Sequence, residues 1–219
     1  SVLDAIARLE VERILFLGDA VGYLPHASEV LSMLAEAGAE CICGNHEQLL
    51  LNPSLASPEN ELIYRHEPAR RTLSSEALET LAAWPEQMCV ELVDGETLLA
   101  VHGSPADPLN GYVYPQDDLE SPLSAAGDVT VVAFGHTHHP FLRQAGGKQF
   151  INVGSVGLPR DQGDLAAFAV FDDSTKHARL YRVHFDVSSV LVDLDNVHSS
   201  VRDVLLRRAD HSLPGDVIA

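Results

Sequence analysis

Four short segments of the chain place a glycine next to residues that can bind a metal ion. They are Gly18-Asp19, Gly44-Asn45-His46-Glu47, His102-Gly103 and Gly135-His136-Thr137-His138. Carboxylate oxygen, amide oxygen and imidazole nitrogen form a mixed donor set that divalent metals accept. A glycine at such a position lets the backbone turn sharply and lets an ion approach closely. The four segments together predict a metal centre.

His136 and His138 are the most specific part of this pattern. Two side chains separated by one residue of an extended chain point the same way, so the two imidazoles can serve two neighbouring ions. Asp19 has two oxygens and can bridge that pair of ions. Two metals about 3.5–4 Å apart form the usual clamp for in-line displacement at phosphorus. The pattern therefore favours phosphoryl-transfer chemistry.

Each segment, taken alone, also has a plainer explanation. Gly18-Asp19 can be a strand-end turn, and Asn45 can satisfy backbone groups in a turn. His102 can be a hydrogen-bonded histidine of the core. Since all four segments combine a glycine with a ligand-type residue after a predicted strand, a shared site explains them better than four separate roles.

The elements that must position these residues are predicted strands at 13–17, 40–43, 97–101 and 129–134. In an open α/β sheet, the crevice lies beyond the carboxyl ends of the strands, so the four segments can meet there. A helix over 1–10 precedes the first strand, and a helix capped by Ser28 and closed by Gly38 joins the first two. This strand–helix–strand order predicts parallel pairing in an α/β layer.

Further elements follow from turn signals and periodicity. A helix starts at Ser74 or Ser75, and the apolar strand 129–134 is expected to be central. Hairpins are predicted around Asp94-Gly95 and Gly146-Gly147, and between 166–171 and 178–185. Residues 48–72 predict a helix fragment with a surface excursion, and 104–128 a long loop. The segment from 188 onward shows weak helical periodicity and should pack outside the sheets.

Composition limits the class of protein. The 219 residues suit one domain spanning 1–219, and no apolar run approaches the ~20 residues of a membrane span. Three cysteines and no secretory signal predict a reduced, cytoplasmic setting. A net charge of −18 opposes binding to long nucleic acid, although bound cations would still allow a small phosphorylated substrate. The oligomeric state stays open.

The four motifs, followed by Asn152-Val153-Gly154-Ser155-Val156-Gly157, resemble the signature of the calcineurin-like metallophosphoesterases. The resemblance runs from about residue 1 to 161 and is closest to the small bacterial and archaeal phosphodiesterase-like branch. It implies a four-layer α/β/β/α sandwich, in which two mixed sheets lie between helices. It also implies a dinuclear metal site at the strand ends, filled by Mn, Fe, Zn, Ni or Co.

The resemblance also implies roles for individual residues. Asp19 bridges the metals; Asn45, His102 and His136 complete the ligands of the second metal, and His138 belongs to the first. His46 is not a ligand and acts near the leaving group as a general acid or a stabiliser of charge. Glu47 orients a neighbouring group. Ser155 and Arg160 are weaker candidates for contacting substrate phosphate, since loop structure and surface charge explain them equally well.

One motif of the family is missing from this sequence. The family opens with a strand bearing Asp-x-His, which supplies the other two ligands of the first metal, and no Asp-x-His triplet occurs here. We interpret this as truncation upstream of Ser1, which removes the first strand of the domain. If the gap is real in the folded molecule, the first metal keeps only Asp19 and His138 and binds weakly.

Two functions are consistent with the sequence. The first is a metal-dependent phosphoesterase, most naturally a phosphodiesterase, in which a hydroxide between the metals attacks phosphorus of a small substrate. The second is a catalytically weak or silent binding scaffold with a partial metal site, which the missing Asp-x-His favours. A nuclease acting on long DNA is disfavoured by the negative charge.

Overall fold

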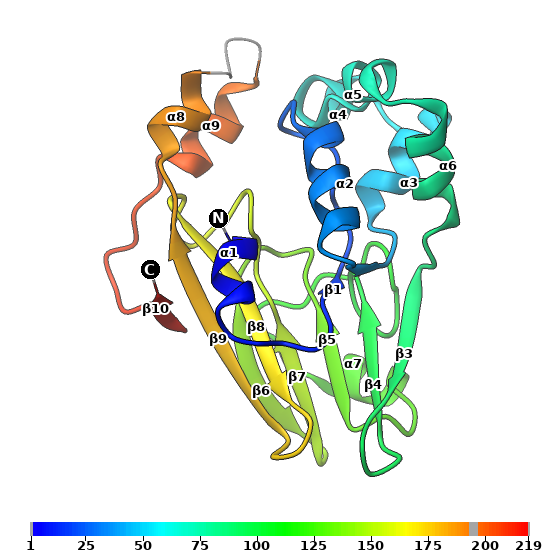
Figure 1. Ribbon diagram of the computed structural model, residues 1–219, viewed down its shortest axis with the longest axis vertical. Coiled ribbons are helices and arrows are strands. Elements are labelled where there is room, and N and C mark those ends of the chain that lie inside the picture. The colour runs from blue at the N-terminus through cyan, green and yellow to red at the C-terminus, as the bar shows by residue number, and fades with distance from the viewer. Residues whose placement is uncertain (1, 193–196, 219) are drawn as a thin grey trace.

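The computed structural model describes residues 2–192 and 197–218, and its strands form three sheets (Figure 1). A parallel pair contains β1 (Leu15–Phe16) and β2 (Glu40–Cys41). A five-stranded mixed sheet runs in the order β3 (Gln87–Glu91), β4 (Thr97–Val101), β5 (Val131–Phe134), β7 (Lys148–Asn152) and β6 (Phe141–Ala145). A three-stranded sheet contains β10 (Asp216–Ile218), β9 (His177–His184) and β8 (Leu165–Asp172).

Helices surround these sheets. They are α1 (Val2–Ala7), α2 (Ala27–Glu36), α3 (Asn45–Leu51), the 3-10 turn η1 (Pro53–Leu55), α4 (Pro58–Tyr64), α5 (His66–Thr72), α6 (Ser75–Ala83), α7 (Glu120–Ala125), α8 (Val187–Val192) and α9 (Ser199–Leu205). None of the helices in the described part of the chain combines the length and apolarity that crossing a membrane requires.

Strand β4 shows how the sequence produces two buried faces. Side chains alternate along a strand, so Leu98 and Ala100 point to one side of the sheet and Leu99 and Val101 to the other. The first pair belongs to a core cluster with Leu17 and residues of β5, β7 and β9, whereas the second belongs to a cluster with residues of α7. The five-stranded sheet is therefore covered on both faces.

The layers follow from these clusters. One face of the five-stranded sheet packs against the segments that carry β1, β2, β8 and β9. Helices α2, α3, α5 and α6 cover the outer face of β1 and β2, and α1 covers β8 and β9. Helix α7 and its flanking loops cover the opposite face of the five-stranded sheet. This arrangement gives the predicted α/β/β/α order.

Most of the predicted elements are confirmed. Strands β1 and β2 are parallel, β5 lies in the middle of its sheet, and the three predicted hairpins form β3–β4, β6–β7 and β8–β9. Ser74 caps α6, since its hydroxyl accepts a hydrogen bond from the backbone N–H of Ala77 at 3.1 Å.

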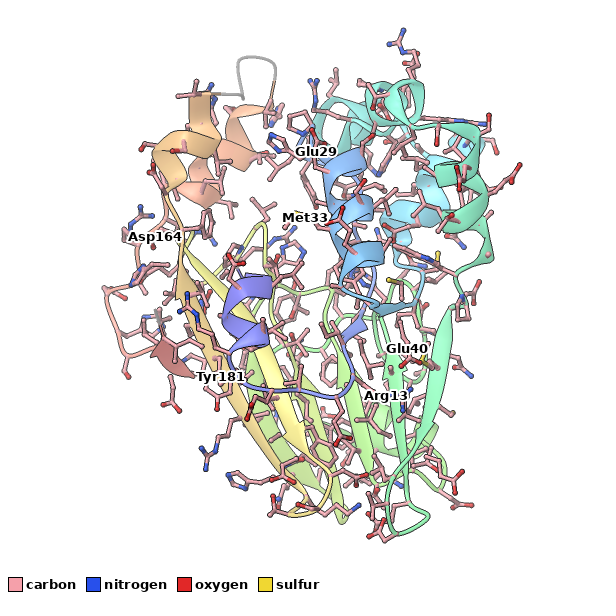
Figure 2. The ribbon with its side chains drawn as sticks, in the orientation of Figure 1. Arg13, Glu29, Met33, Glu40, Asp164 and Tyr181 are labelled. Atoms are coloured by element: carbon pink, nitrogen blue, oxygen red, sulfur yellow. The ribbon has the colours of Figure 1, made fainter. Side chains whose placement is uncertain are left out.

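The strand pair β1–β2 is short and carries an ion pair at its start. Arg13 binds Glu40 through two hydrogen bonds of 2.8 Å, and both residues lie at the base of the pair in Figure 2. In the described residues, β1 pairs with β2 alone and β8 pairs with β9 alone.

The predicted start of α2 is wrong. The helix begins at Ala27, its N-cap is His26, and Ser28 lies in the first turn rather than at the cap. Ala27 is 2% exposed and belongs to the cluster beneath the helix. Burial of Ala27 therefore fixes where the helix begins, and the propensity of serine for capping does not.

Residues 48–72 are more helical than predicted. The Ser57-Pro58 pair, interpreted as a break, begins α4: the Ser57 hydroxyl accepts from the N–H of Asn60, and Pro58 occupies the first turn. Residues 44–47 also differ from the prediction of a strand end, because β2 stops at Cys41 and Asn45 already begins α3. The predicted long loop 104–128 contains the short helix α7.

The C-terminal segment contains α8 and α9, as its weak periodicity indicated, and residues 193–196 lie outside the described residues. Strand β10 was not predicted. It is three residues long and pairs in parallel with β9, and no local sequence pattern predicts this pairing.

Candidate metal centre

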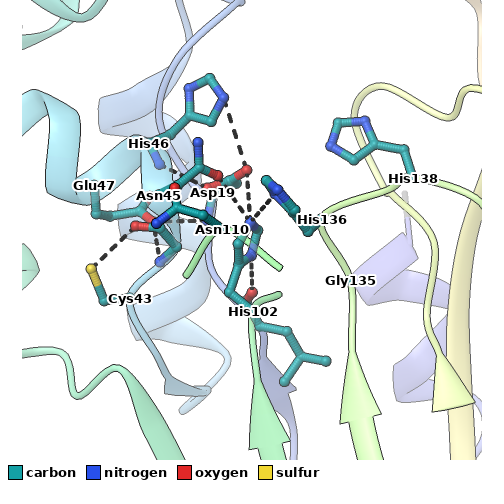
Figure 3. A network of polar contacts seen from close by, with 12 residues as sticks. Asp19, Cys43, Asn45, His46, Glu47, His102, Asn110, Gly135, His136 and His138 are labelled. Atoms are coloured by element: carbon teal, nitrogen blue, oxygen red, sulfur yellow. Dashed lines mark hydrogen bonds and ion pairs between the residues drawn. The ribbon is translucent and has the colours of Figure 1, made fainter. Parts of the chain in front are cut away.

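The side chains of Asp19, Asn45, His102 and His136 meet at one point (Figure 3). The Nε2 atom of His102 lies 3.2 Å from Asp19 Oδ2, 3.2 Å from Asn45 Oδ1 and 3.0 Å from His136 Nδ1. The ligand atoms of Asp19, His102 and His136 all lie within 4.8 Å of one another. Residues separated by up to 117 positions in the sequence thus converge around a single small volume.

The tautomer of His102 follows from its other nitrogen. Nδ1 lies 2.7 Å from the carbonyl oxygen of Leu17, which can only accept, so Nδ1 carries the hydrogen. Nε2 is then free to bind a cation with its lone pair. A backbone carbonyl that fixes the ring of a ligand histidine in this way is the usual support in metal sites.

The donor set fits a cation better than it fits a proton. One hydrogen on His102 Nε2 would face three acceptors at 3.0–3.2 Å and can satisfy only part of them. His136 Nε2 is buried and has no hydrogen-bond partner among the described residues. A divalent ion accepts lone pairs from carboxylate, amide and imidazole atoms together, so this set suits it.

The electrostatics of the cluster agree with this assignment. Burial raises the pKa of Asp19, but the nearby His102 and His46 outweigh burial and lower it overall. Burial lowers the pKa of His102, and the neighbouring Asp19 carboxylate reverses this, so the net pKa is raised. Burial, aided by His102, lowers the pKa of His136 to about 4. Of these two imidazoles, His102 is therefore the one whose protonated form the Asp19 carboxylate favours.

Three residues of the site have left-handed backbone conformations. Asp19, His136 and His138 have φ angles of 62°, 62° and 60°. A non-glycine residue pays roughly 1 kcal/mol or more for this conformation, and such residues concentrate at functional sites. The three residues with this strained backbone are all candidate metal ligands.

Glu47 holds the segment that carries Asp19. Its side chain is 0% exposed, and its two carboxylate oxygens accept backbone N–H groups from Asp19, Ala20, Val21 and Gly44 at 2.7–3.3 Å. Burial and the Asp19 charge raise the pKa of Glu47 to about 7, against these hydrogen bonds. The predicted orienting role of Glu47 is thus exerted on the backbone of a metal-ligand candidate.

Gly44 is required by the close approach of the same two loops. A Cβ atom at this position would lie 2.2 Å from Asp19 Oδ1, far inside van der Waals contact. The backbone N–H of His46 donates to the same Asp19 oxygen at 3.0 Å. The first turn of α3 therefore contacts the Asp19 carboxylate directly, and a side chain at position 44 would prevent this contact.

His46 lies beside the cluster without being part of it. Its Nε2 atom is 4.0 Å from Asp19 Oδ2, and its ring contacts the adjacent rings of Tyr23 and Tyr64 with centroid distances of 4.6 and 4.7 Å. Burial is the main reason that its pKa is lowered. The imidazole is therefore held close to the ion-binding volume and in a fixed orientation.

Residues 1–176 match the family model described as the calcineurin-like phosphoesterase superfamily domain. The chain belongs to this superfamily.

Two curated relatives are similar to this metallophosphoesterase over most of its length. The uncharacterized protein MJ0912 of Methanocaldococcus jannaschii is 26% identical over 208 residues, covering 85% of this chain and 82% of the relative. Phosphodiesterase YfcE of Escherichia coli K12 is 27% identical over 177 residues, covering 74% of this chain and 88% of YfcE. The chain is accordingly a hydrolase of phosphate esters by family.

Solved structures support the fold. A metallophosphoesterase from Sphaerobacter thermophilus superposes with a TM-score of 0.77 at 24% identity, covering 93% of this chain and 92% of the other. Protein PH1004 of Pyrococcus horikoshii superposes with a TM-score of 0.82 at 20% identity, covering 94% and 91%. The four-layer metallophosphoesterase fold is therefore shared.

His138 lies apart from the four clustered residues of this metallophosphoesterase. In Figure 3 its ring stands beyond His136, and no dashed line joins it to the cluster. Its Nδ1 donates to the carbonyl of Leu158 at 2.7 Å, so Nε2 keeps a lone pair. Burial and the charge of Arg160 lower its pKa to about 3. The ring is a neutral donor suited to a second ion.

The loop bearing both histidines is latched by Asn152, which is 0% exposed. Its amide nitrogen donates to the Gly135 carbonyl and the Thr137 hydroxyl at 3.1 and 2.9 Å, and its oxygen accepts the Gly154 N–H at 3.0 Å. Every polar atom of this side chain is engaged in fixing the loop. Asn152 therefore supports the site without touching the cluster.

The two weaker candidates have different surroundings. The Ser155 hydroxyl accepts the N–H of Leu158 at 3.0 Å, so it is engaged in its own loop. Arg160 donates to the Tyr23 hydroxyl at 3.2 Å, and Tyr23 packs on His46. Of the two, Arg160 is the one whose charge lies beside the site.

Sequence reasoning did not connect His46 or His136 to the aromatic and imidazole side chains beside them. Tyr23 and Tyr64 both contact the His46 ring, and His66 Nε2 lies 2.9 Å from His46 Nδ1. Tyr112 packs on His136 with a centroid distance of 4.1 Å. The density of histidine and tyrosine in residues 64–66 was the available signal, but no local pattern ties those residues to His46.

Proposed function

We propose that the protein is a metal-dependent phosphodiesterase that hydrolyses a small phosphorylated substrate. The observation that supports this most directly is the set of distances around His102 Nε2, where three other donor atoms lie within 3.2 Å. The family supplies the ester-hydrolysing class, and the name of the relative YfcE supplies the preference for diesters.

In this proposal, Asp19, Asn45, His102 and His136 hold one divalent ion, and Asp19 with His138 contributes to a second. Mn, Fe, Zn, Ni and Co all accept such oxygen and nitrogen donors. When bound, the ions would polarise the phosphoryl oxygens and lower the pKa of water at the site.

The chain's own residues then orient the substrate and manage the proton. His46, in contact with two tyrosines and 4.0 Å from Asp19, lies where it can protonate the leaving oxygen. Arg160 can bind a phosphate oxygen from beside Tyr23. The charge of −18 limits the substrate to a small molecule whose phosphate the metals neutralise.

Hydrolysis of bis(p-nitrophenyl) phosphate with added manganese tests the proposal. On diphenyl phosphate, whose more basic phenolate leaving group depends on proton donation, His46→Ala should retain bound manganese and lose about 10²- to 10⁴-fold in kcat, the usual contribution of general acid catalysis. His177→Ala, on the exposed surface of β9, is the matched control and should keep wild-type activity. Unchanged turnover in His46→Ala would contradict the role of His46.

A binding scaffold is the second candidate, because His138 has no polar contact with the four clustered residues in Figure 3. Elemental analysis separates the two functions: about two ions per chain with turnover supports the enzyme, whereas no retained metal and no turnover supports the scaffold.

A further inference from the structure

A buried chain of side chains runs from His46 away from the metal centre. His46 Nδ1 lies 2.9 Å from His66 Nε2, and the two rings meet edge to face with centroids 5.0 Å apart. His66 Nδ1 in turn lies 3.7 Å from Glu61 Oε2. His46 comes from α3, His66 begins α5, and Glu61 belongs to α4. We propose that His66, backed by Glu61, is the positioning residue that fixes the orientation and tautomer of His46.

The donor pattern gives this chain a direction. His66 is 3% exposed, and its Nδ1 is buried without a hydrogen-bond partner among the described residues. The group it faces is a carboxylate, which can only accept, so the hydrogen of His66 belongs on Nδ1. At 3.7 Å the carboxylate acts as a nearby charge rather than as a hydrogen-bond acceptor.

The consequence falls on His46. With its hydrogen on Nδ1, His66 presents a lone pair at Nε2, which accepts from Nδ1–H of His46. His46 then has its Nε2 available on the side of Asp19. To act as a general acid, His46 must take up a proton from solvent at Nε2 while Nδ1–H stays on His66, and it then gives the Nε2 proton to the leaving oxygen. This inference therefore rests on the proposed function.

The surroundings leave these groups little freedom. Glu61 is fixed through its other oxygen, which accepts the backbone N–H of Glu67 at 2.7 Å. Tyr64 contacts both His46 and His66, at centroid distances of 4.7 and 5.6 Å. Gly22, with φ of 92°, leaves the space at His46 Nδ1 open, since a Cβ there would lie 2.3 Å from that atom. The absence of a side chain at Gly22 thus leaves room for His46 Nδ1 to contact His66.

The decisive comparison uses two aryl phosphodiesters that release p-nitrophenolate and the more basic phenolate. A leaving group of higher basicity depends more on proton donation. His66→Leu should therefore lose about 10- to 100-fold in kcat on the phenyl ester but stay within about threefold on the nitrophenyl ester. His66→Gln, whose amide oxygen can accept from His46 Nδ1–H, should stay within about threefold on both.

If His66 had only a structural role, His66→Leu would lower the rates on both esters by the same factor, and that result would overturn the inference. Wild-type rates of His66→Leu on both esters would overturn it as well. Glu61→Gln is compared with Glu67→Gln, an exposed residue of the neighbouring helix paired with Arg71 at 3.5 Å. Glu61→Gln should hydrolyse the phenyl ester more slowly than Glu67→Gln does. Equal rates for the two variants would overturn the role assigned to Glu61.

Nitrogen-15 NMR of the histidine rings tests the inference without turnover. The His46 signal should report hydrogen on Nδ1 in wild type and in His66→Gln, and should lose this preference in His66→Leu. A wild-type His46 with hydrogen on Nε2 alone would overturn the assignment. If wild type hydrolyses neither ester, the proposed function fails, while the NMR result still decides whether His66 sets the tautomer.

Discussion

At the scale of single residues, the second nitrogen of each histidine decides what the first can do. His102 and His138 each donate Nδ1–H to a backbone carbonyl, at Leu17 and Leu158, and so turn Nε2 toward the site as a lone pair. His46 differs, because its Nδ1 meets another imidazole, that of His66. In the proposed function, histidines are thereby divided between ion binding and proton handling.

His66 leads to a prediction about stability and pH. Burial, aided by the charge of His46, lowers its pKa to about 4 from the usual 6.5. As pH falls from 6.5 toward 4, the unfolded chain binds a proton at this position that the folded chain does not, so stability falls. His66 should contribute up to about 3 kcal/mol to this loss.

The measurement is the free energy of unfolding by urea at pH 7.5 and pH 5. His66→Gln cannot titrate, so it should lose less stability between these values than wild type. His211→Gln, on the exposed surface, is the control and should match wild type. A His66→Gln protein with the pH dependence of wild type would contradict the prediction.

At the scale of elements, a buried ion pair joins strand β9 to the loop that supports the site. Arg182 is 0% exposed and donates to both oxygens of Asp161, at 2.6 and 3.0 Å, and to the Leu165 carbonyl at 2.7 Å. Asp161 follows Arg160 directly, and Leu158, which fixes His138, lies in the same loop. A strand far along the chain thus anchors the loop beside the metal centre.

Removing one partner of this pair should be costly. Asp161→Ala leaves the buried Arg182 guanidinium without its carboxylate, which should lower the free energy of unfolding by about 3–5 kcal/mol. Arg179→Ala, which removes an exposed cation of the same strand, should change it by less than about 0.5 kcal/mol. Chemical denaturation measures both, and similar values for the two variants would refute the argument.

At the scale of the whole molecule, the proposed ion links the layers. Asp19 follows the segment of β1, His102 follows β4 and His136 follows β5, so one ion joins strands of two different sheets. Binding to the folded state alone stabilises it by mass action. The proposed ion should therefore stabilise the folded protein in addition to taking part in the chemistry.

Metal removal should lower thermal stability. At a free concentration of 100 times Kd, the ion adds about 2.7 kcal/mol, which corresponds to roughly 5–10 °C in Tm for a chain of this size. Differential scanning calorimetry with manganese and with EDTA measures the difference. Asp19→Asn should abolish most of it, whereas Asp210→Asn at the exposed surface should preserve it. If the wild-type Tm were the same with manganese and with EDTA, the proposed metal centre would be refuted.

The sequence by itself determined the donor types, their spacing and most of the elements that carry them. A continuous apolar run predicted β5, and Asp94-Gly95 predicted the hairpin that contains β4, because these signals act between near neighbours. The four glycine-containing motifs also indicated the superfamily. Periodicity and turn chemistry are local, so they can be recognised before the chain is folded.

Only the tertiary structure decided which long-range contacts complete the site. His66 meets His46 across 20 positions, Arg182 meets Asp161 across 21, and Glu47 reaches the backbone of Asp19 across 28. Each contact depends on how separate elements pack, and packing is selected by the burial of the whole core rather than by the residues in contact. The same reason explains why Ala27 starts α2 and why β10 joins β9.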